Sequence, residues 1–161
     1  MQQIDNQHRW SLTVWCGIVN GNVIGPYFCD GMVNAQNYLQ FLRDILPILL
    51  EDIDLNTRRR MWFQHDGAGP HYANIVRDYL NETFRDVWIG RGSRVRWPAR
   101  SPDLTSPDFY LWGYLKDVIY RERPTTRENT MERIRAACNI IPRDVLLRTV
   151  TNFETRIQYC Q

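Results

Sequence analysis

The sequence has 161 residues, of which 43% are hydrophobic and 24% are charged, and its net charge at pH 7 is +2. This balance fits one ordinary globular domain spanning residues 1–161 and excludes a disordered or collagen-like chain. No apolar run approaches the about 18 residues of a membrane span, and the polar first residues do not resemble a signal peptide. The four cysteines are scattered without a Cys-x-x-Cys pair, so we expect reduced thiols in a nuclear or cytoplasmic protein that is not secreted.

The first third of the chain predicts a β-hairpin followed by a helix. Residues 9–19 alternate in polarity and are rich in β-formers, Asn20-Gly21 begins a turn, and residues 23–28 return as a second strand. From residue 34 to residue 49 the apolar side chains follow helical spacing. Pro47 should bend or shorten this helix, because proline has no N–H to donate.

The rest of the chain alternates between strands and helices. We expect a polar loop at 56–60, a strand buried on both faces at 61–65, a helix at 70–84, short strands at 87–89 and 94–97, and helices at 106–120, 126–140 and 142–159. Pro70 suits a first helical turn, and Ser106-Pro107-Asp108 is a helix start signal. This order predicts a mixed α/β fold built in layers.

Two carboxylates occupy conspicuous positions in this pattern. Asp66 stands at the end of a predicted strand, within FQHDGAGPHY, and Asp108 stands in the first turn of a predicted helix. Each has a structural explanation. Asp-Gly after a strand is ordinary turn chemistry, and an aspartate in the first turn interacts favourably with the helix dipole by about 0.3–1 kcal/mol.

The residues around both carboxylates connect them. HDGAGPHY followed by WPARSPDLTSPDFYLWGYLKD resembles the catalytic part of mariner-type transposases, members of the DDE/DDD superfamily. Asp66 matches the family's second catalytic aspartate and Asp108 its third acid, with 41 residues between them. The resemblance covers about residues 9–120, and residues 121–161 would add C-terminal helices. It implies an RNase H-like mixed sheet with flanking helices.

The resemblance also implies a metal-dependent reaction on DNA, with cleavage and strand transfer. Asp66 and Asp108 would hold Mg²⁺ or Mn²⁺, hard cations that prefer oxygen ligands and act in pairs about 3.5–4 Å apart. His65 and His71 flank the site, which leaves zinc as a lesser alternative. We expect core packing for His65, and helix-start hydrogen bonding or a phosphate contact for His71.

A basic segment lies between the two motifs. It holds five arginines and one acid: Arg85, Arg91, Arg94, Arg96 and Arg100 against Asp86. Arginines interleaved with Trp88 and Trp97 are typical of nucleic-acid surfaces, although a solvated loop would have the same composition. We take His71, Arg91, Arg94, Arg96 and Arg100 as candidate DNA contacts, with DNA rather than a membrane or small molecule as the partner.

Two parts of the family pattern have no match in this sequence: the strand with the first catalytic aspartate, and the N-terminal DNA-reading domain. Asp5 is the only acid before Arg9, and it lies too close to the predicted strand 9–19 to be carried over. We therefore expect the opening strand of the sheet to be missing. Its two neighbours would pair directly, receive a strand from another chain, or leave the domain poorly stable.

Two functions stay open at this point. The first is a transposase-derived domain with little or no remaining cleavage activity. The second is a non-catalytic module that binds DNA or partners a full-length transposase or a second copy of itself.

Overall fold

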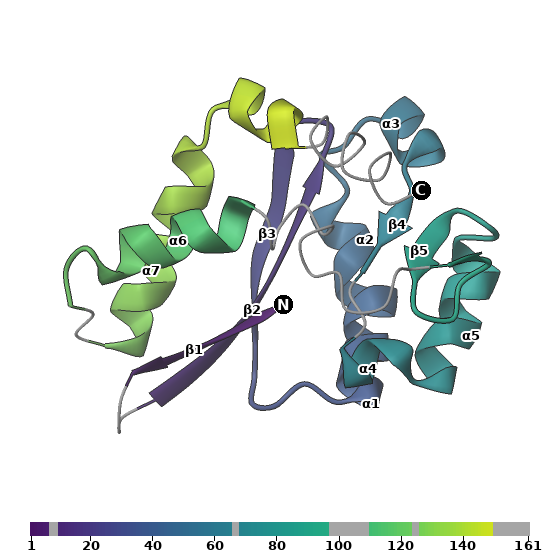
Figure 1. Ribbon diagram of the computed structural model, residues 1–161, viewed down its shortest axis with the longest axis horizontal. Coiled ribbons are helices and arrows are strands. Elements are labelled where there is room, and N and C mark those ends of the chain that lie inside the picture. The colour runs from purple at the N-terminus through teal and green to yellow at the C-terminus, as the bar shows by residue number, and fades with distance from the viewer. Residues whose placement is uncertain (7–9, 66–67, 97–109, 124–125, 150–161) are drawn as a thin grey trace. The chain divides into compact units, whose positions relative to one another are not determined.

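The computed structural model describes residues 1–6, 10–65, 68–96, 110–123 and 126–149, with the backbone alone for residues 5, 6, 95 and 96. Contacts divide the chain into two compact units: a terminal unit of residues 1–32 and 106–161, and a central unit of residues 33–105 (Figure 1). None of the described helices is long and apolar enough to cross a membrane. The single domain spanning all 161 residues stays a prediction.

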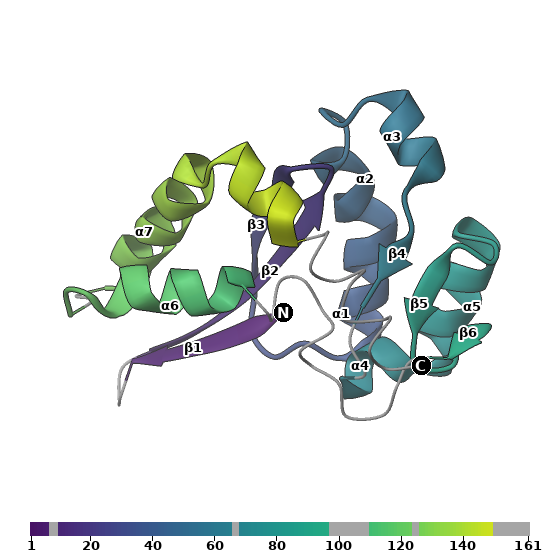
Figure 2. The ribbon, with the colours of Figure 1, turned by 45° about the horizontal axis from the view of Figure 1, so that its top comes forward.

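The described strands of the terminal unit form one three-stranded antiparallel sheet (Figure 2). Its order is β1 (Gln2–Asn6), β2 (Trp10–Val19) and β3 (Asn22–Cys29). Between β2 and β3, Asn20 and Gly21 both have positive φ, 45° and 75°. Two left-handed residues are what the tightest hairpin turns require, so the predicted hairpin is confirmed.

Strand β1 corrects one expectation. We expected the opening strand of the sheet to be missing, so that its two neighbours would pair directly, receive a strand from another chain, or leave the domain poorly stable. Instead β1 pairs with β2 in a register running from Gln2 opposite Val14 to Asn6 opposite Trp10. Ile4, which is 4% exposed, lies opposite Leu12 and anchors the pairing in the core. The cross-strand contact, rather than the polar sequence QQIDN, makes this segment a strand.

Helices complete the core of the terminal unit. They are α6 (Trp112–Tyr120), α7 (Arg127–Ile140) and a helical segment at 143–149. Thr126 caps α7, since its hydroxyl accepts a hydrogen bond from the N–H of Asn129 at 3.0 Å. The buried core draws on β2 and both helices, and includes Leu12, Val14, Cys16, Leu111, Leu115, Ile119, Ile134, Ala137 and Cys138. The strand residues alternate and the helix residues recur every three or four positions, as the sequence pattern predicted.

The central unit opens with three helical segments in succession: α1 (Ala35–Gln40), a π-helical turn η1 (Phe41–Ile45) and α2 (Leu46–Leu49). Asn34 and Asn37 form a reciprocal capping box at the start, with bonds of 2.9 and 2.8 Å. Within η1 the N–H of Leu46 reaches back five residues to the carbonyl of Phe41. The predicted bend therefore falls just before Pro47.

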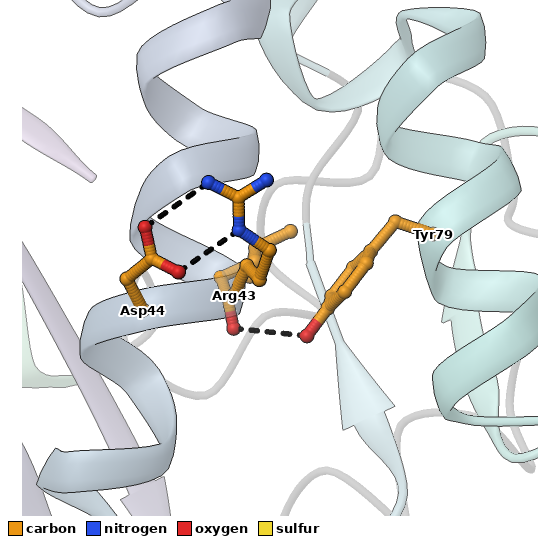
Figure 3. A network of polar contacts seen from close by, with 4 residues as sticks. Arg43, Asp44 and Tyr79 are labelled. Atoms are coloured by element: carbon orange, nitrogen blue, oxygen red, sulfur yellow. Dashed lines mark hydrogen bonds and ion pairs between the residues drawn. The ribbon is translucent and has the colours of Figure 1, made fainter.

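A tyrosine from another helix compensates for this proline. In a π-turn the carbonyl of Leu42 would accept from residue 47, but proline has no N–H. The hydroxyl of Tyr79, on α5 (Asn74–Thr83), donates to that carbonyl at 3.3 Å (Figure 3). Beside it, Arg43 donates to both carboxylate oxygens of Asp44, at 2.9 and 3.1 Å. Helix α5 is thus joined to the irregular turn of the first helix.

The predicted loop at 56–60 is wrong. Residues Leu55–Arg60 form helix α3. The Asp54 carboxylate caps it, accepting hydrogen bonds from the Thr57 N–H at 2.9 Å and the Thr57 hydroxyl at 2.6 Å. The helix buries no side chain fully, so the apolar period that would have revealed it is absent.

A second sheet, parallel and three-stranded, lies in the central unit with the order β4 (Phe63–Gln64), β5 (Trp88–Gly90) and β6 (Val95–Arg96). Strand β4 is shorter than the predicted 61–65. It is not buried on both faces, since Phe63 and Gln64 are half-buried and Trp62 is 50% exposed. The described residues show no pairing between β2 and β4, which belong to different sheets.

The helix predicted at 70–84 is divided in two. Helix α4 (Gly69–Tyr72) ends at Ala73, whose extended backbone (φ −57°, ψ 145°) separates it from α5. Val76 and Leu80 on α5 are fully buried. The last residues of α4 lie against α1, where the His71 ring contacts Tyr38, and beside the turn at Gly92, which lies close to Tyr72.

Candidate functional site

The backbone that leads to Asp66 is held in the central sheet. Strand β4 receives support on one side from β5: Phe63 N–H donates to the Val87 carbonyl at 2.9 Å, and His65 N–H donates to the Ile89 carbonyl at 3.1 Å. Asp66 follows His65 directly but lies outside the described residues. The last described position before the candidate carboxylate is therefore a buried, hydrogen-bonded strand end.

Aromatic side chains surround this strand end. The His65 ring is 6% exposed and lies edge-on to Trp88, with centroids 5.5 Å apart. It also stacks on the ring of His71, with centroids 5.3 Å apart. The hydroxyl of Tyr38, on α1, is 3.4 Å from His65 Nδ1. Elements β4, β5, α4 and α1 thus meet in one aromatic cluster at the end of β4.

Both histidines belong to this cluster. Core packing was the role expected for His65, and the structure gives His71 the same environment, since His71 is 4% exposed and its ring centroid is 4.2 Å from that of Tyr38. The described conformation leaves the His71 ring little surface for DNA, and a phosphate contact there stays a prediction. In the described part of the chain, no three histidine, cysteine or acidic side chains gather as a metal site.

The third matched acid, Asp108, also lies outside the described residues, as do the residues of the Ser-Pro-Asp-Leu motif before it. Its helix is confirmed from Trp112 onward. Leu111 and Trp112 are 0% and 4% exposed, so the start of this helix is anchored in the core of the terminal unit. The roles of Asp66 and Asp108 as metal ligands stay predictions.

The predicted basic segment is exposed where the structure describes it. Arg91 and Arg94 lie on the surface, in the turn between β5 and β6. Arg94 forms an ion pair of 3.4 Å with Asp86, and both side chains are well exposed. Arg96 belongs to β6, of which the structure gives only the backbone at this residue, and Arg100 lies outside the described residues.

Two residues missed by the sequence analysis join this basic surface. The guanidinium carbon of Arg91 lies 4.2 Å from the centroid of the Tyr72 ring, and that of Arg77 lies 5.2 Å from it. Both distances are within the range of cation–π attraction. Tyr72 ends α4 and Arg77 belongs to α5, so no short sequence motif connects them to Arg91.

Several known proteins are similar to this chain in sequence or in fold. The chain is 28% identical over 149 residues to the Tc3 transposase of Caenorhabditis elegans, covering 91% of this chain and 42% of that protein. The catalytic domain of Mos1 transposase, solved with raltegravir and Mg, superposes with a TM-score of 0.82 at 21% identity, over 99% of this chain and 78% of that one.

The chain resembles a transposase in sequence and the Mos1 mariner transposase catalytic domain in fold. The catalytic domain of Mos1 mariner transposase superposes in a further structure with a TM-score of 0.79 at 21% identity, over 99% of this chain and 76% of that one. A Mos1 paired-end complex with the left transposon end gives 0.77 at 23% identity, over 98% of this chain and 44% of that one. No family model matches the sequence. The predicted mixed α/β fold and the resemblance to mariner-type transposases are confirmed, and this chain spans less than half of the Tc3 protein.

Proposed function

We propose that this chain is a DNA-binding domain derived from a mariner-type transposase, with Asp66 and Asp108 as the carboxylates of an ancestral strand-cleavage site. The similarity to the Mos1 catalytic domain over 99% of the chain carries this proposal. Mos1 structures with Mg, with Mn and with transposon ends support divalent metal and DNA as the ligand classes. A domain that acts on chromosomal DNA would work in the nucleus.

The side chains around the strand end fit a metal site made of oxygen ligands. His65 and His71 are buried against each other and against Tyr38, which leaves carboxylates as the natural donors. Carboxylate oxygens suit Mg²⁺ or Mn²⁺ and do not favour zinc. Asp66 and Asp108 would hold the ion, which would supply activation of the attacking oxygen and stabilisation of the leaving oxygen.

We expect little or no cleavage by this chain alone. The family's first catalytic aspartate has no match in this sequence, and Asp5 on β1 is the only acid before β2. Two carboxylates compensate less of the charge of two divalent cations than three do, so the second ion would bind weakly. Weaker metal binding need not change the fold or the affinity for DNA.

Nicking of supercoiled plasmid in Mg²⁺ or Mn²⁺ tests the proposed site. The wild-type chain is compared with Asp66→Ala and Asp108→Ala, each shown to be folded by circular dichroism. Cleavage that both substitutions abolish would assign a working site to the two carboxylates. Cleavage that persists in both variants would contradict their assignment.

The alternative is a non-catalytic module that binds DNA, or that partners a full-length transposase or a second copy of this chain. The exposed arginines at 91 and 94 favour the DNA-binding form of this alternative. DNA affinity that falls with salt and survives Asp66→Ala, without any nicking, would support it. Light scattering of the chain with and without DNA would test the self-association.

A further inference from the structure

Three side chains from separate elements form a compact basic site on the central unit. Tyr72 ends α4, Arg77 lies on α5, and Arg91 follows β5. The Tyr72 ring, which is 37% exposed, has both guanidinium groups over it, at 4.2 Å for Arg91 and 5.2 Å for Arg77. An aromatic ring fixes two positive charges that would otherwise repel each other and move freely.

The backbone at Gly92 allows the turn after β5 to approach Tyr72 and Arg77 closely. Gly92 has φ +89°, a conformation that other residues rarely adopt. A Cβ at this position would lie 3.0 Å from Arg77 Cδ and 3.3 Å from Tyr72 Cε2. The turn after β5 therefore packs tightly on the stem of Arg77 and on the tyrosine ring, and the site depends on this close approach.

No acid neutralises the two arginines within the described residues. The ion pairs there join Arg43 to Asp44, Arg94 to Asp86 and Arg148 to Asp144. Within the described residues, two guanidinium groups without an acidic partner at one place indicate a site for an anion.

We propose that Tyr72, Arg77 and Arg91 bind the phosphodiester backbone of DNA. This inference rests on the proposed DNA-binding function and adds α4 and α5 to its contact surface. The guanidinium groups match phosphate oxygens with their N–H donors while the ring supports their faces. Two guanidinium groups lie over the ring, so we assign it the support of the arginines rather than base stacking. The contact is therefore independent of the base sequence, and it positions the DNA strand on the protein.

Salt-dependent binding to duplex DNA tests the site. Fluorescence anisotropy measures affinity for two duplexes of unrelated sequence between 50 and 200 mM salt, for the wild-type chain and for the double variant R77Q/R91Q. Glutamine keeps the stem and removes the charge. We expect the slope of log affinity against log salt to decrease by about 2 for the double variant, equally on both sequences.

Arg43→Gln is the matched control for each charge removed. It removes one positive charge in the same unit, half of what the double variant removes, at an arginine already paired with Asp44. Its slope should equal that of the wild type. A double variant that behaves like this control, or that weakens binding to one sequence only, would overturn the site while leaving DNA binding by the chain intact. A wild-type chain that shows no salt-dependent binding would overturn both.

The tyrosine provides a second test that leaves net charge unchanged. Tyr72→Phe keeps the ring and should bind as the wild type does. Tyr72→Leu removes the support of both guanidinium groups and should weaken binding to both duplexes. Thermal unfolding of each variant shows that it is folded at the assay temperature. Equal affinity of folded Tyr72→Leu and wild-type protein would contradict the role of the ring.

Discussion

The imidazole rings of His65 and His71 lie nearly parallel, with 13° between their planes and 5.3 Å between their centroids. One ring belongs to the residue just before Asp66 and the other to helix α4. The stack therefore joins the end of β4 to helix α4, which begins within the same motif. In this structure the two histidines of the HDGAGPH motif therefore support the strand end that directly precedes Asp66 in the sequence.

Tyr38 completes this support from α1, and its removal should be costly. Tyr38 is 1% exposed, and its ring stacks with that of His65 and lies tilted against that of His71. Its hydroxyl lies 3.4 Å from His65 Nδ1. We expect Tyr38→Ala to lower the free energy of unfolding by about 3–5 kcal/mol, and Tyr38→Phe by about 1 kcal/mol. Urea unfolding followed by tryptophan fluorescence measures both. Equal losses for the two variants would show that the hydroxyl, and not the ring, matters.

Gly90 should be intolerant of a side chain, because His65 occupies the space beside it. A Cβ at Gly90 would lie 2.6 Å from His65 Nε2. Gly90→Ala should therefore displace the histidine and lower the free energy of unfolding by about 1–3 kcal/mol. Among the described residues, no atom outside the backbone of its own helix and its chain neighbours lies within 4 Å of a Cβ built at Gly113 in α6, so Gly113→Ala should raise stability by up to about 1 kcal/mol. A chain that tolerates both substitutions equally would contradict the packing at β4.

Helix α3 should loosen in acid. The hydroxyl of Thr57 donates to the Asp54 carboxylate and lowers its pKa below the ordinary value of 3.8. Because the pKa is lower in the folded chain, the cap stabilises α3 above pH 3.8 and is lost as the pH falls through the lower folded value. NMR titration of the Thr57 amide should show this change. Asp54→Asn keeps a capping oxygen without the charge and should abolish the pH dependence.

Asp86 restrains Arg94, so its neutralisation should strengthen DNA binding. The ion pair between them spans 3.4 Å and is exposed, so it contributes little to stability. We expect Asp86→Asn to increase both DNA affinity and its salt dependence, while the melting temperature changes little. Asparagine is the right substitution because residue 86 has φ +60°, which asparagine tolerates. Unchanged affinity in anisotropy would exclude Arg94 from the DNA surface.

The sequence predicted those elements whose signals are local. The hairpin follows from Asn20-Gly21, and α7 from the Thr126 cap and its apolar spacing. Strand β1 and helix α3 were missed for opposite reasons. The first is a polar segment that becomes a strand only by pairing with β2. The second had a capping signal at Asp54, but no apolar face to extend it.

In the candidate site too, the sequence predicted some residues and not others. His65 and the exposed arginines could be located from the motif and from charge. The aromatic cluster and the Tyr72 site could not, because their members come from separate elements whose packing no local pattern specifies. Tyr72 and Arg91 meet through the turn at Gly92, and nothing in the sequence specifies which ring that turn will contact.

Strand β1 has a consequence for how copies of this chain behave toward one another. It covers five residues of β2 with a complete ladder, so β2 has a neighbour on both sides. Without the first six residues, β2 would present a row of unpaired backbone groups beside Leu12 and Val14. Such an edge is a template for intermolecular strand pairing and aggregation. Strand β1 thus moves the open edge of the sheet from the apolar β2 to a strand whose residues, apart from the buried Ile4, are polar, and this makes edge-to-edge pairing with a second molecule less favourable.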